Sequence, residues 1–339
     1  MFEKATENTS KESYVFGIYA NFLFTVRHDM DRAQEMFQRA IETNPSDATA
    51  LGLYARFLFA TCGDMGRTQK MFQRAINADP HDAPTLGGYA LFLHTVRGDM
   101  DQAEQMYQRA INADPTNATL LRRYADFLCH VRGDMDQADQ MYQRAIDADP
   151  NDATTLHSYI FFLCHVRRDM DQAEQMYQQA ISADPNDTII LHAYADFLRH
   201  VRGDMDLAQE MYQQAISADP NDTITLGNYA QILFAKSDGM KAISLAEKAI
   251  TLVRDERYLL AECHFYLYSH SPEHRKESGK ALKALLAEGV TTGDWSFEMN
   301  LERLRSEDDP RLNLLEAVAR TLGDGDMSRL NAFEEWRDL

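Results

Sequence analysis

Apolar residues recur along this chain with the spacing of amphipathic helices, and the arrangement repeats every 35 residues. In the block that ends at Pro150, one apolar face runs through residues 121–128 and a second runs through residues 135–146. Apolar positions three and four apart lie on the same side of an α-helix. Each block therefore predicts two helices joined by a short turn, and we expect an all-α fold.

Residues at the ends of these segments support the same interpretation. Asp134 precedes the second helix and Gln137 follows three residues later, which is the spacing of a capping box. Pro150 closes the block, because proline ends one helix and fits the start of the next. Equivalent prolines stand at positions 45, 80, 115, 185 and 220. A helix pair repeated at a fixed period predicts a solenoid, in which each unit buries its apolar face against its neighbours.

The blocks resemble the tetratricopeptide repeat (TPR). In the sixth block the resemblance rests on Leu191, Tyr194, Ala195, Leu198, Ala208, Tyr212, Ala215 and Pro220. It covers residues 13–254 as seven tandem units and implies a right-handed α-α superhelix, the TPR solenoid. The blocks run one residue longer than the usual repeat of that family, and we assign the extra residue to the turn at residues 131–134.

The two ends of the chain differ from the repeats. Residues 1–12 form a polar N-terminal segment, and residues 255–339 are expected to form a helical cap, because a solenoid needs an end that covers its stacking face. The helices expected in this cap span residues 256–270, 275–288, 311–322 and 327–336. Parts of it, at 286–295 and 332–337, are similar to tails that close bacterial TPR proteins, which implies a bacterial cytoplasm.

The composition narrows the possible functions. The formal net charge is −19 over 339 residues, which disfavours nucleic acid as a partner because a phosphate backbone needs a cationic surface. Residues 1–13 do not look like a signal peptide, and no apolar run approaches the ~20 residues of a membrane span. We therefore expect a cytoplasmic protein without membrane contact, whose cysteines (Cys62, Cys129, Cys164 and Cys263) are reduced.

The family resemblance places a concave groove along the first helix of each unit. Units one to three present mostly small or apolar residues there, whereas units four to six present charged, aromatic and imidazole side chains. These predicted partner-binding residues are Arg122, Asp126, His130, His157, Phe161, His165, His192, Asp196, Arg199 and His200. We predict that they bind an extended or helical peptide with acidic and aromatic groups, more tightly at mildly acidic pH, since histidine titrates near ~6.5. The other interpretation is that near-identical repeats copied the same exposed histidines without selection for binding.

Zinc is an alternative ligand, because Cys129–His130 and Cys164–His165 supply suitable ligand types. Adjacent residues diverge by ~100° around a helix, however, and packed helices lie ~8–10 Å apart, so four ligands are hard to gather. We expect no metal and no cofactor.

Catalytic motifs are also missing: there is no glycine-rich phosphate loop, no histidine pair that brackets a glutamate and no nucleophile elbow. We therefore predict a non-enzymatic scaffold for protein–protein interaction, with no catalytic residues. The second candidate is an immunity or antitoxin-like binder, whose acidic outer surface masks a basic partner. Neither interpretation specifies an oligomeric state.

Overall fold

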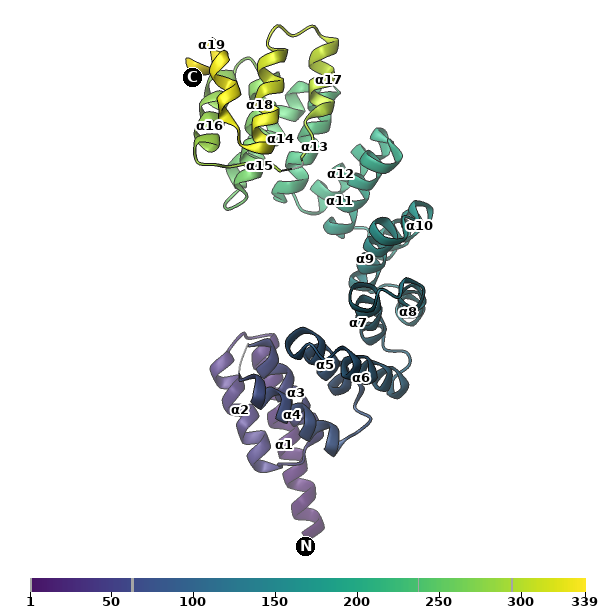
Figure 1. Ribbon diagram of the computed structural model, residues 1–339. Helices are drawn as coiled ribbons and strands as arrows, with labels where there is room; N and C mark the ends of the chain where they lie inside the picture. Colours follow the sequence, from purple (N-terminus) through teal and green to yellow (C-terminus); the bar gives the residue numbers. More distant parts are fainter. Residues whose placement is uncertain (1, 62–63, 237, 294) are drawn as a thin grey trace. The chain divides into compact units, whose positions relative to one another are not determined.

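A computed structural model describes residues 2–61, 64–236, 238–293 and 295–339. Cys62 lies outside these residues. The chain divides into two compact units, residues 1–176 and residues 177–339, which we describe separately (Figure 1). The described residues are helical and contain no strand, which confirms the predicted all-α fold of stacked helix pairs.

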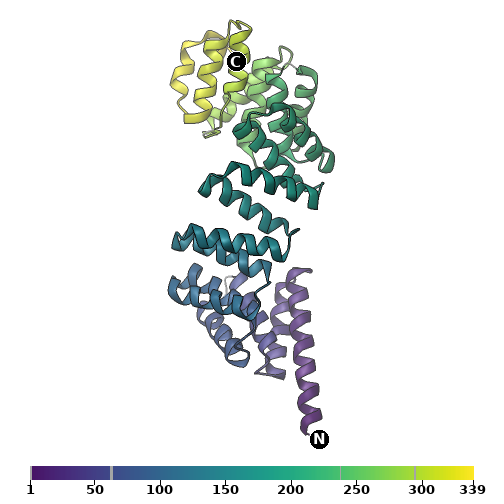
Figure 2. The same ribbon diagram turned by 90° about the vertical axis from the view of Figure 1, so that its right-hand side faces the viewer.

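Unit 1 is a series of antiparallel helix pairs, with each pair packed against the next (Figures 1 and 2). Its helices are α1 (Phe2–Thr25), α2 (Met30–Thr43), α3 (Ala48–Ala60), α4 (Met65–Ala78), α5 (Ala83–Phe92), α6 (Met100–Ala113), α7 (Ala118–Phe127), α8 (Met135–Ala148) and α9 (Ala153–Phe162). The next helix, α10 (Met170–Ala183), begins in unit 1 and ends in unit 2.

Unit 2 continues the pairs and adds the C-terminal region. Its helices are α11 (Thr188–Phe197), α12 (Met205–Ala218), α13 (Thr223–Ala235), α14 (Gly239–Leu252), α15 (Arg257–His270), α16 (Arg275–Ala287), α17 (Glu298–Ser306), α18 (Leu312–Asp324) and α19 (Glu334–Arg337). The α15–α16 pair packs on α13 and α14 as the earlier pairs pack on one another, so the hairpin arrangement continues beyond residue 254.

The C-terminal region departs from the predicted helices in two places. Helix α17 lies between the expected helices 275–288 and 311–322, where no helix was expected. The helix expected at 327–336 is a 3₁₀ turn, Met327–Ala332, followed by the short α19.

The extra residue of the repeat lies in a π-helical turn. The first helix of four pairs continues into such a turn, at Leu93–Arg97, Leu128–Arg132, Leu163–Arg167 and Leu198–Arg202. A π-turn closes hydrogen bonds over five residues instead of four and so accommodates one residue more. Helix α13, in the block one residue shorter, has none. In these four pairs the extra residue is therefore accommodated where the first helix ends, in a turn that includes Val131 and Arg132 of the assigned stretch 131–134.

The start of helix α8 has the aspartate cap that the sequence indicates. Asp134 accepts a hydrogen bond from the backbone N–H of Gln137 at 3.0 Å, and the Gln137 side chain donates to the Asp134 carboxylate at 2.8 Å. This cap satisfies an N–H group that the helix itself leaves unpaired.

Aromatic pairs join each repeat of unit 1 to the next. An aromatic residue of one second helix packs on a tyrosine of the following first helix, with ring centroids 5.4–5.6 Å apart; the pairs are Phe37–Tyr54, Phe72–Tyr89, Tyr107–Tyr124 and Tyr142–Tyr159. Because these rings are almost fully buried, they form the core that holds successive repeats together.

Candidate functional site

Six of the ten predicted partner-binding residues lie in unit 1. Helix α7 and its π-turn carry Arg122, Asp126 and His130, and helix α9 and its π-turn carry His157, Phe161 and His165. We call the surface formed by these six residues the A-face. His130, His157, Phe161 and His165 are exposed on it.

The π-turns orient two of these histidines in the same way. The Nδ1 atom of His130 lies 2.9 Å from the carbonyl oxygen of Asp126, and that of His165 lies 3.0 Å from the carbonyl oxygen of Phe161. A carbonyl oxygen only accepts, so Nδ1 carries the proton in both rings and the neutral form has a free acceptor at Nε2. On protonation, Nε2 becomes a cationic donor that suits a carboxylate.

Phe161 supplies an exposed apolar side chain on the A-face. Its side chain is 48% exposed, although large aromatic residues bury most of their surface in the core of this fold. The ring stacks on His165 with centroids 4.3 Å apart and an interplanar angle of 22°. The stacked rings of Phe161 and His165 form a flat surface on which an aromatic or aliphatic group of a partner can pack.

Asp126 has a structural role that the sequence did not reveal. Its carboxylate accepts a hydrogen bond from the buried hydroxyl of Tyr142 and forms an ion pair with Arg122 at 2.9 Å. One repeat earlier, Leu91 occupies the position of Asp126, and the buried hydroxyl of Tyr107 has no partner among the described residues. The carboxylate of Asp126 thus satisfies a buried donor that would otherwise be unpaired.

The remaining four predicted residues lie in unit 2, where His192 and Asp196 form an internal network. The Nε2 atom of His192 lies 3.1 Å from a carboxylate oxygen of Asp196, and its Nδ1 lies 2.8 Å from the hydroxyl of Thr225. Asp196 also accepts a hydrogen bond from Tyr212. Burial acts to raise the pKa of Asp196, but the hydrogen bond and charge of His192 and the charge of Arg199 outweigh it and hold that pKa below its usual value.

Arg199 is buried instead of facing a partner in an open groove. Its side chain is 1% exposed, and its guanidinium donates to the side chain of Gln231, contacts His200 at 2.6 Å and lies 5.4 Å from the ring centroid of Trp295. Burial and the charge of Arg199 lower the pKa of His200. Arg199 therefore connects a repeat helix to the C-terminal region.

Helix α17 and the residues before it lie on the first helices of unit 2. Gln231 of α13 donates to the backbone oxygen of Ser296 at 2.9 Å, and the amide of Asn300 donates to the backbone oxygen of Gln231 at 3.2 Å. Arg303 donates to the backbone oxygen of Phe234. Gln231 occupies the repeat position of Asp126, so the C-terminal segment covers in unit 2 the helix side that the A-face presents in unit 1.

A buried carboxyl lies close to this contact. Glu262 of α15 is 3% exposed, and burial raises its pKa to about 8, although the charge of Arg199 opposes the shift. Glu262 was not among the predicted residues, because α15 lies beyond the repeats assigned to residues 13–254. It is a titratable group on the inside of unit 2.

The cysteines and histidines considered as zinc ligands differ in their exposure to solvent. Cys129 is buried and Cys164 half-buried, whereas their neighbours His130 and His165 are exposed. Burial raises the pKa of both thiols, which opposes the thiolate form that binds metal. No cluster of three or more potential metal ligands occurs within residues 2–61, 64–236, 238–293 and 295–339.

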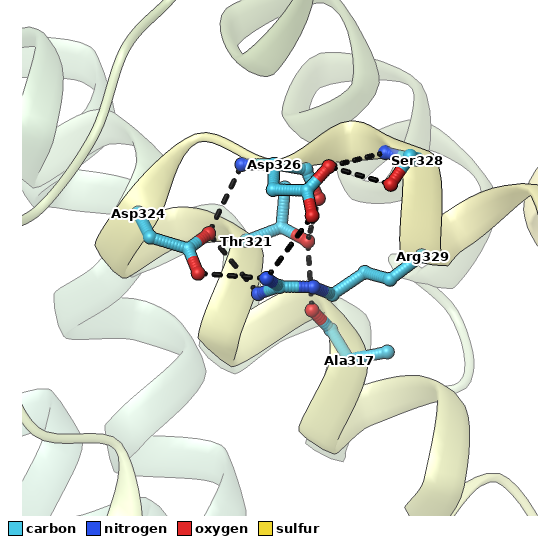
Figure 3. Close-up of polar contacts among 6 residues, drawn as sticks. All are labelled: Ala317, Thr321, Asp324, Asp326, Ser328 and Arg329. Atoms are coloured by element: carbon cyan, nitrogen blue, oxygen red, sulfur yellow. Dashed lines mark hydrogen bonds and ion pairs between the residues drawn. The ribbon is translucent and has the colours of Figure 1, made fainter.

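Outside the repeats, the carboxylates of Asp324 and Asp326 are both paired with Arg329. Arg329 donates to both carboxylate oxygens of Asp324, at 3.0 and 2.7 Å, and to Asp326 at 3.4 Å (Figure 3). The hydrogen bond from Arg329 lowers the pKa of Asp324. This cluster joins the end of α18 to the 3₁₀ turn that follows.

Comparison with solved structures supports the fold. The C-terminal part of a TPR repeat-containing protein from Cytophaga hutchinsonii is 16% identical, and the match covers 73% of this chain and 98% of that chain with a TM-score of 0.55. PilF of Pseudomonas aeruginosa is 16% identical, with 63% and 94% covered and a TM-score of 0.52. No curated protein matches the chain in sequence. In the part of the chain that the structure describes, no helix has the length and apolar character needed to cross a membrane.

Family models match three separate stretches of the repeats. Two models described as tetratricopeptide repeat match residues 27–83 and residues 97–158. A third, described as "TmcB, TPR repeats", matches residues 162–224. With the stacked helix pairs and the recurring aromatic contacts, these matches show that the chain belongs to the tetratricopeptide repeat family.

Proposed function

We propose that this protein is a non-enzymatic interaction scaffold whose A-face binds a peptide segment or a helix of a partner protein. Proteins of this family in general mediate protein–protein interaction and are in general non-enzymatic. The observation that carries the proposal is the exposed stack of Phe161 on His165, because an apolar ring at a solvent-facing position of a repeat protein stabilises no core contact that would explain it.

The chemistry of the A-face defines the expected partner. Phe161 favours an aromatic or aliphatic side chain, and the protonated rings of His130 and His165 favour carboxylates through Nε2. The partner is therefore a segment with both acidic and aromatic residues. A rigid scaffold loses little conformational freedom on binding, so a few such contacts suffice.

The residues of unit 2 contribute differently to this proposal. Arg199 contacts Trp295 of the C-terminal segment, and Asp196 pairs with both His192 and Arg199. We therefore assign these three residues to internal contacts of unit 2. His200 remains exposed, and we include it among the partner-facing residues.

A peptide library in which acidic and aromatic positions vary independently tests the proposal, with affinity measured by fluorescence anisotropy on the full chain. For the tightest peptide, we expect Phe161→Ala to weaken binding by about tenfold or more. Ile189→Ala, at a 67% exposed apolar residue outside the A-face, is the matched control. Equal affinities of the wild type and Phe161→Ala for every peptide would contradict the proposal.

Replacement of the two exposed imidazoles provides a second measurement. For an acidic peptide, His130→Gln with His165→Gln should weaken binding, because the change removes both imidazole Nε2 groups from the A-face. A scrambled peptide of the same charge distinguishes the A-face from general attraction.

A further inference from the structure

Large apolar side chains are exposed on one side of α1. Val15, Ile18, Tyr19, Phe22 and Val26 are 41–60% exposed. Val15, Tyr19, Phe22 and Val26 follow one another at intervals of four, three and four residues, and Ile18 lies beside Tyr19, so the five share one helix face. Val26 follows the last residue of α1 and continues its final turn, because its backbone N–H donates to the carbonyl oxygen of Phe22 at 2.9 Å. We call these five residues the α1 stripe. The other exposed large apolar residues beyond residue 30, such as Ile189 and Met240, stand singly along the described chain.

The α1 stripe has the character of a repeat-stacking surface. Tyr54 and Tyr89 occupy the position of Tyr19 in the next two repeats, and there they are 1% and 5% exposed. They are buried because an aromatic residue of the preceding second helix packs on them, as Phe37 packs on Tyr54. Helix α1 packs on α2 and α3 and lies at one end of unit 1 (Figure 2). The stripe thus corresponds to the surface of a first helix that, in the later repeats of unit 1, is covered by the preceding repeat.

The α1 stripe of a second copy of the chain is a surface that can cover this one, because both are apolar and have the same length. A two-fold interface needs one self-complementary surface. In an antiparallel pair of α1 helices, Val15 meets Val26 and Tyr19 meets Phe22 of the second copy. Exposed charges flank the stripe, with Glu12 at one end and Arg27 at the other, so each glutamate then lies near an arginine of the other copy.

We propose that α1 forms an antiparallel two-fold pair with α1 of a second copy of this chain. Apolar contact along the stripe provides the attraction, and the Glu12–Arg27 pairs at both ends fix the antiparallel direction. This interface uses a surface separate from the A-face, so both can be occupied at once.

Sedimentation velocity of the full chain over a range of concentrations tests the pairing. The wild type should dimerise, and Val15→Glu should weaken the dimer by about a hundredfold or more, because it places a charge from each copy inside the apolar contact. Ile189→Glu, an equally exposed apolar site elsewhere, should leave the dimer intact. Circular dichroism at 222 nm confirms that each variant keeps its helices.

A charge exchange tests the direction of the pair. Glu12→Arg and Arg27→Glu should each weaken the dimer roughly fivefold to thirtyfold, since each change affects two symmetric pairs, and the double variant should regain the affinity. A wild-type chain that stays monomeric at every concentration would overturn the proposal and assign the α1 stripe to a different protein. Failure of the double variant to recover would overturn the antiparallel arrangement.

Discussion

The guanidinium of Arg199 lies 5.4 Å from the ring centroid of Trp295, and this contact joins a repeat helix to the C-terminal segment. Arg199 follows α11, whereas Trp295 precedes α17. Gln231 extends the contact, because its side chain accepts from Arg199 and donates to Ser296. In unit 2, the chain's own C-terminal segment therefore occupies the helix side that TPR resemblance assigns to a partner.

Replacing Arg199 with alanine should destabilise unit 2 by roughly 2–4 kcal/mol. The change deprives the carboxylate of Asp196 of its buried cationic partner, and it deprives the side-chain oxygen of Gln231 of its hydrogen-bond donor. Both tryptophans lie in unit 2, so their fluorescence during urea unfolding reports on this unit. Arg320→Ala is the control: this side chain is 74% exposed, and its loss should change stability by about 0.5 kcal/mol or less. Equal effects of the two changes would show that Arg199 does not hold the segment.

Glu262 should make the stability of unit 2 depend on pH. Its pKa is raised to about 8 in the folded chain by burial, whereas an unfolded glutamate ionises near ~4.3. Between these values the unfolded chain has released the proton that the folded chain keeps, so this contribution to stability is complete below about pH 4 and is lost as the pH rises through about 8. Glu262→Gln should therefore gain stability relative to the wild type from about pH 5 to about pH 8. Urea unfolding followed by tryptophan fluorescence measures the difference, and a constant difference would contradict the prediction.

Tyr142 and Tyr107 provide a matched pair of hydroxyl deletions at the same repeat position. Tyr142→Phe should destabilise the protein by about 1–2 kcal/mol, because it leaves Asp126 without its buried donor. Tyr107→Phe should be neutral or slightly stabilising, because the Tyr107 hydroxyl is buried without a partner among the described residues. Unit 1 contains no tryptophan, so circular dichroism during urea unfolding is the measurement. The reverse order of the two effects would refute the assigned role of Asp126.

The residue after each π-turn provides a test of backbone strain. Gly133 has φ of +71°, and no atom lies within 4 Å of the position of an added Cβ, so Gly133→Ala should cost about 1 kcal/mol through conformation alone. Arg168 adopts the same left-handed conformation with φ of +56°. Arg168→Gly should stabilise the protein by roughly 0.5–1 kcal/mol. Thermal unfolding followed by circular dichroism gives both values; a loss of stability in Arg168→Gly would mean that its side chain makes a contact worth more than the strain.

The repeat helices were largely predictable, since their signals are local. Apolar periodicity, the Asp134 cap and the closing prolines each act within a few residues, so the sequence displays them directly. The π-helical conformation of the turn that holds the extra residue was not predictable, because a π-turn and a longer loop need the same number of residues. Helix α17 was missed for a related reason: its stability comes from contacts with α13, which are distant in sequence.

For the predicted partner-binding residues, the sequence indicated the helix side on which they lie but not whether they are already paired. Exposed positions such as His130 and Phe161 follow from repeat periodicity, which identifies the side of a helix that its packing residues leave free. Whether a polar residue at such a position is free or already paired depends on its neighbours in space. Asp126 accepts from Tyr142 of the same repeat, and Arg199 is covered by a segment that no periodicity connects to it.

The sequence by itself determined the helix pairs, their caps and their membership of a tetratricopeptide repeat array, because these depend on short-range patterns that recur block after block. The tertiary structure alone decided which first helices remain open, which are covered by α17 and which face of α1 is exposed among the described residues. The physical reason is that burial is a property of surfaces brought together by the fold. Residues at identical repeat positions, such as Tyr19 and Tyr54, have the same local sequence signals and different surroundings.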